Sequence, residues 1–448
     1  MYGPPKPGSK IIIVGAGCFG LATALALSSD KEKNYDIHVF DRGVIPIIDA
    51  ASTDISKAVR MDYGTNKLCM ELAVDAIRVW EQWNKERAEN GLKPVYHNTG
   101  MIAFSDNGEL SEYDKQGLET IREAGYGEFI EELSSEEIKK RYPFFETAVN
   151  NGYDIAYFNK VGGGYSWCNS SEAIMHIYKK CISNGVNFIL GKESGCFESN
   201  LVDPQSPRTV LGIKTIDGNE HRGDRVILAT GPWTPGVIDM QGQVIASGQV
   251  IVQFKLSDKD RRSLNDLPVW SGNVSKTGCY GFPVNDDGIL KIGKHSIGYL
   301  NPRATDNISI PRTQASNPGD TIPLKALNEF REFLDTFLPL TTPLDVFYSR
   351  VCWYSDSIDG DFVICPHPNY DNYIVATGDS GHAMKFLPNI GQKIKDVIDA
   401  KDTEYTRAWA WRNKEAKLDF YDRPLLIQNN HKVLRMVTLE ELKAKINC

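Results

Sequence analysis

The chain has 448 residues, of which 41% are hydrophobic and 24% are charged, with a formal net charge of -8. This composition is typical of a globular protein with two or three domains' worth of core, and it excludes a disordered or fibrous chain. The acidic balance argues against a nucleic-acid partner, and the longest apolar runs, such as 11–14 and 44–48, are far short of the roughly 20 residues of a membrane-spanning helix.

The cysteines and the terminal residues indicate the cellular compartment in which the protein is expected. Nine cysteines are scattered without a CxxC pair or a His/Cys cluster at metal spacing, which predicts reduced thiols and no metal site. Residues 1–7 lack an apolar signal core. The last residues, Ile446, Asn447 and Cys448, do not form a Ser-Lys-Leu-type peroxisomal signal, and Cys448 is expected to be an exposed tail thiol. We therefore expect a cytoplasmic protein, with the peroxisome left open.

A dinucleotide-binding pattern opens the chain. Residues 10–14 are predicted to form a buried parallel strand, followed by a glycine-rich loop, a helix over 21–27 and a second strand over 36–40. Glycine allows a tight turn and a close approach to a pyrophosphate, and an acid about 20 residues later suits a ribose. The predicted contacts are Gly15, Gly17, Cys18, Phe19, Gly20, Asp41 and Arg42. The alternative is a glycine turn without a ligand.

Further elements follow in chain order. We expect an amphipathic helix over about 66–89, a strand over 100–104, and a charged, helical and peripheral region over 110–140. A helix over 170–183 and strands over 186–190 and 210–216 come next. The buried strand 225–229 ends in a glycine turn that places Gly231 and Trp233 among the candidate cofactor contacts. Residues 242–350 are expected to be mostly β.

This order predicts two interleaved domains. The nucleotide-binding domain is expected to comprise 1–95, 151–240 and 340–448, and a mostly antiparallel substrate domain to comprise 96–150 and 241–339. The predicted fold class is α/β, or α+β overall, with a Rossmann-like first domain.

The segment 350–391 carries an anion-binding pattern. It contains Cys352 among aromatic residues, two apolar strands, and a glycine-rich turn before a helix expected to begin near Pro388. Asp379, Gly381 and Lys385 lie in that turn, where free N–H groups and the positive end of the helix dipole favour an anion.

These segments together resemble the sarcosine oxidase and amadoriase family of FAD-dependent amine oxidases over nearly the whole chain. Residues 350–391 and 407–412 look most like fungal fructosyl amino acid and fructosyl peptide oxidases and their saccharopine-oxidising relatives. The resemblance implies FAD joined through a thioether to Cys352. The alternative for Cys352, and the expectation for Cys365, is a buried structural cysteine.

The resemblance also implies roles in catalysis. Arg60 and Lys385 would hold the substrate carboxylate, and Lys291 would lie over the flavin and assist oxygen reduction. His295 and His382 would lie near the substrate, and Arg412 matches a tail arginine that binds a carboxylate. The alternatives are that Lys291 faces solvent on its strand, that the two histidines are structural, and that Arg412 lies on the surface.

One departure concerns the substrate. Sugar-amine oxidases carry Asn-Lys where this chain has Ser56 and Lys57 and usually lack an arginine at Arg60, so the chain is closer here to the sarcosine and pipecolate branch. Three cations, Arg60, Lys385 and Arg412, would suit a substrate such as saccharopine with more than one carboxylate.

The sequence therefore predicts a FAD-dependent oxidase of the secondary amine C–N bond of an N-substituted amino acid, of saccharopine or fructosyl amino acid type. Hydride transfer, imine hydrolysis and reoxidation by molecular oxygen would give hydrogen peroxide. The alternatives are an oxidase of a cyclic or N-methyl amino acid such as pipecolate or sarcosine, possibly in specialised metabolism, a non-catalytic dinucleotide-binding module, and a nicotinamide dehydrogenase. The expected partners are a small amino-acid-derived substrate and oxygen, and the expected state is a monomer.

Overall fold

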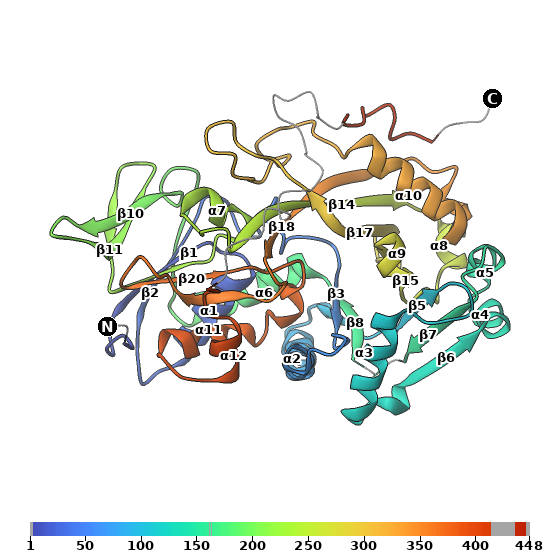
Figure 1. Ribbon diagram of the computed structural model, residues 1–448, viewed down its shortest axis with the longest axis horizontal. Helices are drawn as coiled ribbons and strands as arrows, with labels where there is room; N and C mark the ends of the chain where they lie inside the picture. Colours follow the sequence, from blue (N-terminus) through green and yellow to red (C-terminus); the bar gives the residue numbers. More distant parts are fainter. Residues whose placement is uncertain (1–2, 161, 163, 414–434, 445–448) are drawn as a thin grey trace.

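A computed structural model describes residues 3–160, 162, 164–413 and 435–444. The predictions made for Ile446, Asn447 and Cys448 fall outside these residues. Figure 1 shows two halves, with a sheet and its helices around the N-terminus on the left and a larger sheet on the right. Within the described residues, none of the helices combines the length and apolarity needed to cross a bilayer.

The first half is built on a six-stranded sheet. Its strands pair in parallel except for the edge strand β19, which runs antiparallel to β20. Ile11, Ile12 and Ile13 are fully buried, because a parallel strand is covered on both faces. In spatial order the strands are β19 (Val363–Pro366), β20 (Tyr373–Thr377), β13 (Arg225–Leu228), β1 (Lys10–Val14), β2 (Asp36–Asp41) and β9 (Asn187–Leu190).

Different layers cover its two faces. Ile11 and Ile13 belong to a core shared with helices, whereas Ile12 and Val14 face a small antiparallel sheet on the other side, as the two-residue strand period requires. The helices are α1 (Cys18–Ser29), α2 (Lys67–Glu89), α6 (Ser170–Ser183), α11 (Ile390–Ile398) and α12 (Glu404–Ala408). The small sheet comprises β10 (Phe197–Asp203), β11 (Ser206–Thr215) and β12 (Glu220–Arg222).

The second half is an eight-stranded sheet, antiparallel except for the parallel pair β15 and β5. The helix α10 (Leu324–Phe337) packs on one face, where Phe333 stacks on Trp270. In spatial order the strands are β18 (Tyr348–Ser357), β14 (Val244–Lys255), β17 (Ile289–Tyr299), β16 (Cys279–Gly281), β15 (Val269–Gly272), β5 (Met101–Ser105), β7 (Ile155–Asn159) and β6 (Ile130–Ser134).

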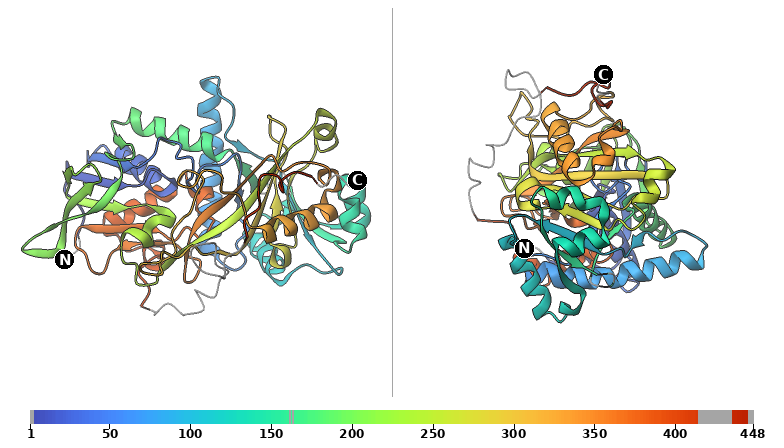
Figure 2. Two further views of the ribbon diagram at one scale, coloured as in Figure 1. Left: turned by 90° about the horizontal axis from the view of Figure 1, so that it is seen from above. Right: turned by 90° about the vertical axis from the view of Figure 1, so that its right-hand side faces the viewer.

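A second small sheet lies at the junction of the halves, where Figure 2 shows the light-blue α2 projecting. It comprises β3 (Lys57–Arg60), β8 (Tyr165–Cys168) and β4 (Tyr96–His97). The remaining helices are α3 (Glu112–Glu123), α4 (Ser135–Arg141), α5 (Glu146–Asn150), α7 (Thr234–Val237), α8 (Asp258–Ser263) and α9 (Val274–Thr277). The short 3-10 turns are η1 (Gly127–Phe129), η2 (Pro143–Phe145), η3 (Gly231–Trp233), η4 (Pro339–Thr341) and η5 (Ala383–Phe386).

The predicted mixed α/β class is confirmed, and two element predictions are incomplete. The region 110–140 contains the strand β6 between its helices, because this charged edge strand is fixed by pairing with β7. The region 242–350 contains the 14-residue helix α10, whose apolar residues follow a helical spacing.

Sheet membership differs from the predicted domain boundaries at two strands. β7 and β18 belong to the eight-stranded sheet, although both lie in segments assigned to the nucleotide-binding domain. The strands of the six-stranded sheet all lie in the segments assigned to that domain. We propose the same two interleaved domains, with β7 and β18 counted in the second.

Candidate active site

The loop between β1 and α1 is closed by its glycines. Gly15 has a φ of +106° and donates its N–H to the carbonyl of Phe40 at 2.7 Å. A Cβ at Gly20 would overlap the carbonyl oxygen of Gly15. A larger residue at Gly20 would therefore push α1 away from the loop, and a Cβ at Gly15 would overlap the carbonyl of Ala229 that follows β13.

Asp41, at the end of β2, holds this loop in place. Its carboxylate accepts hydrogen bonds from the backbone N–H of Ala16 at 2.8 Å and of Gly43 at 3.0 Å. Burial raises the pKa of Asp41 above its ordinary value, against these hydrogen bonds. The acid that the sequence predicts at this position thus lies beside the glycine loop.

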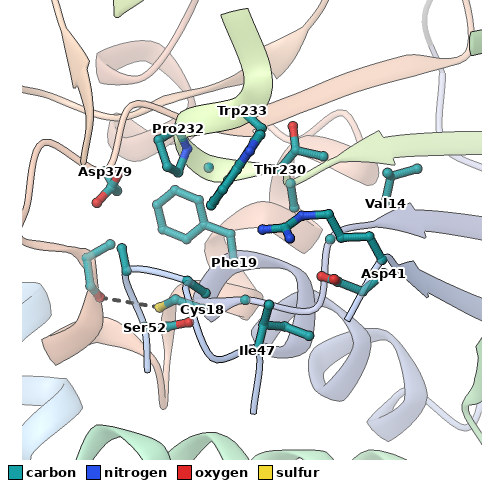
Figure 3. Close-up of a pocket in the computed structure, with 18 of the residues that line it drawn as sticks. Val14, Cys18, Phe19, Asp41, Ile47, Ser52, Thr230, Pro232, Trp233 and Asp379 are labelled. Atoms are coloured by element: carbon teal, nitrogen blue, oxygen red, sulfur yellow. Dashed lines mark hydrogen bonds between the residues drawn. The ribbon is translucent and has the colours of Figure 1, made fainter. Parts of the chain in front are cut away.

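A cavity of about 220 Å³ opens above the loop. Figure 3 shows the side chains of Trp233 and Phe19 entering it, with Asp41 and Asp379 on opposite sides. The guanidinium carbon of Arg42 lies 4.4 Å from the centroid of the Trp233 ring. The predicted cofactor contacts that line the cavity are Gly15, Gly17, Cys18, Phe19, Asp41, Arg42, Lys57, Gly231, Trp233, Asp379 and Gly381.

A second cavity of about 630 Å³ lies between the eight-stranded sheet and the junction. Lys57, Tyr354, Gly381 and Met384 line both cavities. The predicted catalytic residues Arg60, His295, His382 and Lys385 line the second one. The fold therefore brings a polar, cation-bearing cavity against the end of the loop-bound cavity.

Two basic side chains of the second cavity are arranged around Tyr63. Lys385 Nζ lies 2.9 Å from the Tyr63 hydroxyl and 5.0 Å from its ring centroid. The Arg60 guanidinium carbon lies 5.1 Å from the same ring centroid, and its NH1 is 3.7 Å from Asp62 Oδ2. The indole N–H of Trp80 donates to the Lys385 carbonyl at 2.8 Å and anchors η5. Such a pair of basic side chains is suited to a carboxylate.

The two histidines differ in their surroundings. His382 Nδ1 lies 3.0 Å from the Tyr63 hydroxyl, and its Nε2 lies 3.0 Å from the Gly360 carbonyl. Burial, together with the charge of Lys385, lowers the pKa of His382 to about 3, so this ring is neutral. His295 is exposed, and its ring centroid lies 6.1 Å from that of Tyr354.

A buried charge cluster lies behind the junction. Asp54 Oδ2 lies 2.7 Å from Lys291 Nζ, 3.3 Å from Arg350 NH2 and 3.6 Å from Lys57 Nζ. Lys291 also donates to the Ser56 carbonyl at 2.6 Å. Burial lowers the pKa of Lys291 to about 8 against the opposing effect of Asp54. Although burial opposes ionisation, Lys291 and the other two cations hold the pKa of Asp54 below its usual range.

Cys352 lies next to this cluster on β18. Its sulfur is 3.8 Å from Lys57 Nζ and 4.0 Å from Arg350 NH2, and the residue is 4% exposed. Cys352 and Lys291 lie beyond the residues that line the two cavities, whereas Lys57 lines both. Cys365 is buried on β19, and burial raises its pKa to about 12.

Arg412 is placed differently from its predicted role. Its guanidinium forms a two-pronged pair with the carboxylate of Asp359 at 3.0 and 2.9 Å, and its NH1 donates to the Phe362 carbonyl at 2.6 Å. Asp359 lines the second cavity, but Arg412 is not among the lining residues. The tertiary structure thus gives this arginine an internal carboxylate partner.

Sequence reasoning missed Asp54, Tyr63 and Arg350. Asp54 stands two residues before Ser56, and Tyr63 stands three residues after Arg60, so both were near predicted positions. A local sequence pattern cannot predict a partner that is distant in the chain. Cys352, which contacts Lys57, is an example, since the two are 295 residues apart in sequence.

Comparisons with known proteins give a consistent result. The family model described as FAD dependent oxidoreductase matches residues 10–397. L-saccharopine oxidase of Schizosaccharomyces pombe is 30% identical over 423 residues, covering 90% of this chain and 93% of that protein. Monomeric sarcosine oxidase of Bacillus sp. (strain B-0618) is 25% identical over 399 residues, covering 88% and 93%. The structure of fructosyl peptide oxidase from E. terrenum aligns with a TM-score of 0.81 and 27% identity, covering 92% and 94%.

Proposed function

Because the chain belongs to the FAD-dependent oxidoreductase family, we propose that it oxidises the secondary amine C–N bond of an N-substituted amino acid and passes the electrons to oxygen. One observation carries the proposal. The cavity above the glycine loop and the cavity that contains Arg60 and Lys385 share lining residues at Lys57 and Gly381. A cofactor in the first cavity would therefore end beside a substrate in the second.

The first cavity fits the adenine dinucleotide part of FAD. A Cβ at Gly17 would meet only the Ser52 hydroxyl, and nothing lies within 4 Å of a Cβ at Gly231, so ligand groups can approach both backbones. The N-terminus of α1 follows the loop and favours a pyrophosphate. Gly15, Asp41, Arg42 and Trp233 would hold this part, and Lys57, Asp379 and Gly381 would hold the part nearer the junction. Gly20 and Ser56, which were also predicted as contacts, do not line the cavity. Gly20 packs against Gly15, and the Ser56 carbonyl accepts from Lys291. When bound, FAD accepts a hydride from the carbon next to the amine.

Covalent attachment through Cys352 is part of the proposal. Two basic side chains, Lys57 and Arg350, lie within 4.0 Å of the Cys352 sulfur. Lys57 also lines both cavities. The sulfur is therefore adjacent to the junction where the flavin ring would lie.

Arg60 and Lys385 would hold the substrate carboxylate, with neutral His382 completing that wall of the cavity. Fixing the carboxylate restricts the amine and its neighbouring C–H to one orientation, and orientation supplies a large part of such catalysis. Met101, Ala103, Val269 and Phe282 add an apolar cluster to the lining of the same cavity, which would help to exclude water from the reacting carbon.

Lys291 would assist the reduction of oxygen. It is 2% exposed and paired with Asp54, so it supplies a buried positive charge near the junction. A fixed charge in a water-excluded site stabilises developing negative charge strongly. The second product would be hydrogen peroxide.

The substrate is proposed by class. The saccharopine type comes first because the matched saccharopine oxidase is 30% identical, and the fructosyl amino acid type follows from the aligned fructosyl peptide oxidase. The cyclic or N-methyl type remains the second candidate, since Ser56, Lys57 and Arg60 follow that branch. The cavity is lined by Arg60 and Lys385 but not by Arg412, which weakens the argument for three cations on one substrate. We further propose that the protein acts as a cytoplasmic monomer.

The test is a substrate screen on the purified flavoprotein. Saccharopine, a fructosyl amino acid, pipecolate and sarcosine would each be added without oxygen, and bleaching of the yellow chromophore would be recorded. Peroxide would then be measured in air. We expect bleaching by at least one of the four and peroxide in proportion to the amine consumed. A flavin that no secondary amine bleaches would overturn the proposal in favour of a dinucleotide-binding module.

A further inference from the structure

A chain of hydrogen bonds leads away from the second cavity at Lys385. Lys385 Nζ donates to the Tyr63 hydroxyl at 2.9 Å, and the distance from that hydroxyl to His382 Nδ1 is 3.0 Å. His382 Nε2 lies 3.0 Å from the Gly360 carbonyl. A carbonyl only accepts, so Nε2 of the neutral ring carries the proton and Nδ1 accepts from Tyr63. The lone pairs of the Tyr63 hydroxyl are thereby left for Lys385.

Lys385 lacks a direct ion-pair partner among the residues that the structure describes. It is 3% exposed, and within the described part of the chain no carboxylate lies within ion-pair distance of its Nζ. Burial and the neighbouring Arg60 lower its pKa well below the ordinary value. The other groups that act on it are Asp62, the thiol of Cys69 on α2 and the thiol of Cys168 on β8, together with neutral His382. Burial raises the pKa of each thiol to about 12, so both stay uncharged.

We infer that Lys385 meets the substrate as a neutral amine and takes the proton that the substrate ammonium must lose before oxidation. The inference rests on the proposed function. A secondary amine is protonated in neutral water, but only its neutral form has the lone pair that expels a hydride from the adjacent carbon. In an amino acid the amine and the carboxylate share one carbon, so a group that binds the carboxylate is within reach of the amine, directly or through one water.

The transfer balances without any co-reactant. One N–H bond of the substrate ammonium breaks, and its electron pair stays on the substrate nitrogen. The lone pair of Lys385 Nζ forms a new N–H bond, and the resulting ammonium faces the carboxylate of the same substrate. Substrate binding and substrate deprotonation thus become one event.

The surroundings of Lys385 suit the charged product. The protonated side chain has three N–H donors, and two acceptors are already present in the Tyr63 hydroxyl at 2.9 Å and the His382 carbonyl at 3.0 Å. The third donor is left for the substrate carboxylate. Tyr63 is the positioning residue, because its hydroxyl is held in the accepting orientation by His382 Nδ1.

The experiment measures how many protons the protein takes up when it binds a ligand. The ligand has a carboxylate but no amine, so it cannot itself supply a proton to Lys385. (Methylthio)acetate has sulfur where the substrate has nitrogen. Because it has no amine lone pair, it can bind to the holoenzyme without undergoing the amine oxidation. Its binding would be followed by titration calorimetry in buffers of different ionisation enthalpy. At about pH 9 an ordinary lysine, with a pKa of about 10.4, is already charged. We expect uptake of close to one proton per site. An uptake of zero would overturn the inference.

Two variant pairs assign the proton. Lys385→Met should abolish the uptake, whereas Lys393→Met should retain it, because Lys393 lies over the ring of Tyr405 and does not line the cavity. Uptake that persisted in Lys385→Met would place the proton on another group, such as Lys291, and would overturn the inference.

Tyr63→Phe provides the second readout and decides the matter if Lys385→Met no longer binds the acid. Loss of the hydroxyl acceptor disfavours the charged lysine, so the curve of proton uptake against pH should move to lower pH. Tyr405→Phe should leave the curve in place. Weaker binding at every pH without movement of the curve would contradict the role of Tyr63. The number of protons taken up can be measured even if the substrate screen fails, so the two tests are independent. If the enzyme bound no carboxylic acid, the carboxylate site at Arg60 and Lys385 would itself be refuted.

Discussion

Lys291 Nζ and Asp54 Oδ2 lie 2.7 Å apart, and each side chain is only 2% exposed. Asp54 also faces Arg350 and Lys57 at 3.3 and 3.6 Å. One buried carboxylate therefore faces three basic side chains beside Cys352. We expect this arrangement to affect both the stability of the junction and the charge near the proposed flavin site.

Replacing Asp54 by Asn keeps the shape of the side chain and removes its charge. We expect the free energy of unfolding to fall by about 3 to 5 kcal/mol, because removal of one partner leaves buried charge without compensation. Denaturant titration measures the loss. The control Asp36→Asn removes a half-exposed carboxylate paired with His38 and should change stability by less than about 1 kcal/mol. Equal losses in the two variants would contradict this account of Asp54.

The rate at which oxygen reoxidises the reduced enzyme should fall in alkaline solution. The native pKa of Lys291 is about 8, so its positive charge disappears as the pH rises through that value. Stopped-flow reoxidation of the reduced enzyme should slow above about pH 8, and Lys291→Met should be slow at every pH while anaerobic reduction by the amine persists. Since the unfolded chain keeps this proton to a higher pH, the group by itself makes the free energy of unfolding rise with pH between 8 and 10.5. A rate of reoxidation that stayed constant from pH 7 to about 10 would exclude Lys291 from the oxygen step.

Cys352→Ala should release the flavin on acid precipitation. In the parent protein we expect the yellow colour to stay with the pellet, because a thioether survives denaturation, and in the variant we expect it in the supernatant. Cys365→Ala is the matched control, since Cys365 is an equally buried cysteine on the other sheet and should leave the colour in the pellet. Free colour from the parent would mean that FAD is bound without the covalent link.

Arg60 and Arg412 should differ in their effects on the substrate. Arg60→Met removes a charged donor from the cavity lining and should raise KM by about 10- to 100-fold, as expected for a lost hydrogen bond to a charged group. Arg412→Met breaks the pair with Asp359 and should change KM by less than about threefold. Steady-state kinetics on a monocarboxylate and a dicarboxylate substrate provide the comparison. A rise in KM confined to the dicarboxylate in Arg412→Met would support the role predicted from the sequence.

Gly391→Ala should destabilise the nucleotide-binding half. A Cβ at Gly391, on α11, would overlap the backbone carbonyl of Ala22 on α1, so the two helices would have to separate. We expect a loss of about 1 to 3 kcal/mol from this overpacking, measured by thermal unfolding. The neighbouring exposed position gives the control, Gln392→Ala, which should be neutral within about 0.5 kcal/mol. An unchanged melting temperature in Gly391→Ala would contradict the close contact.

Local patterns account for what the sequence predicted of the fold. The first strand, the glycine loop and the helices α1, α2 and α6 depend on interactions between residues close in the chain. The predicted ranges of α2 and α6 agree with the structure to within a residue, whereas α1 begins three residues before the predicted 21–27 and ends two residues after it. β6 escaped prediction because two adjacent glutamates interrupt its pattern and it lies in a charged region, so that pairing with β7 defines it as a strand. The helix α10 was not predicted, although its apolar residues have helical spacing. It lies in a region whose other segments have strand-like patterns, and the whole region was therefore predicted to be mostly β.

The sequence by itself determined the dinucleotide loop, the mixed α/β class and the residue types able to bind a carboxylate, because each depends on a short stretch of chain or on side-chain chemistry. Tertiary structure decided which partners those side chains have. Lys291 and Asp54, Lys57 and Cys352, and Lys385 and Tyr63 come together only because β17, β18 and η5 converge on β3 and its flanking residues. Arg412 carries the charge that the sequence required, yet folding places Asp359 against it. Burial and neighbouring charge follow from that convergence, and they set the protonation states on which the chemistry depends.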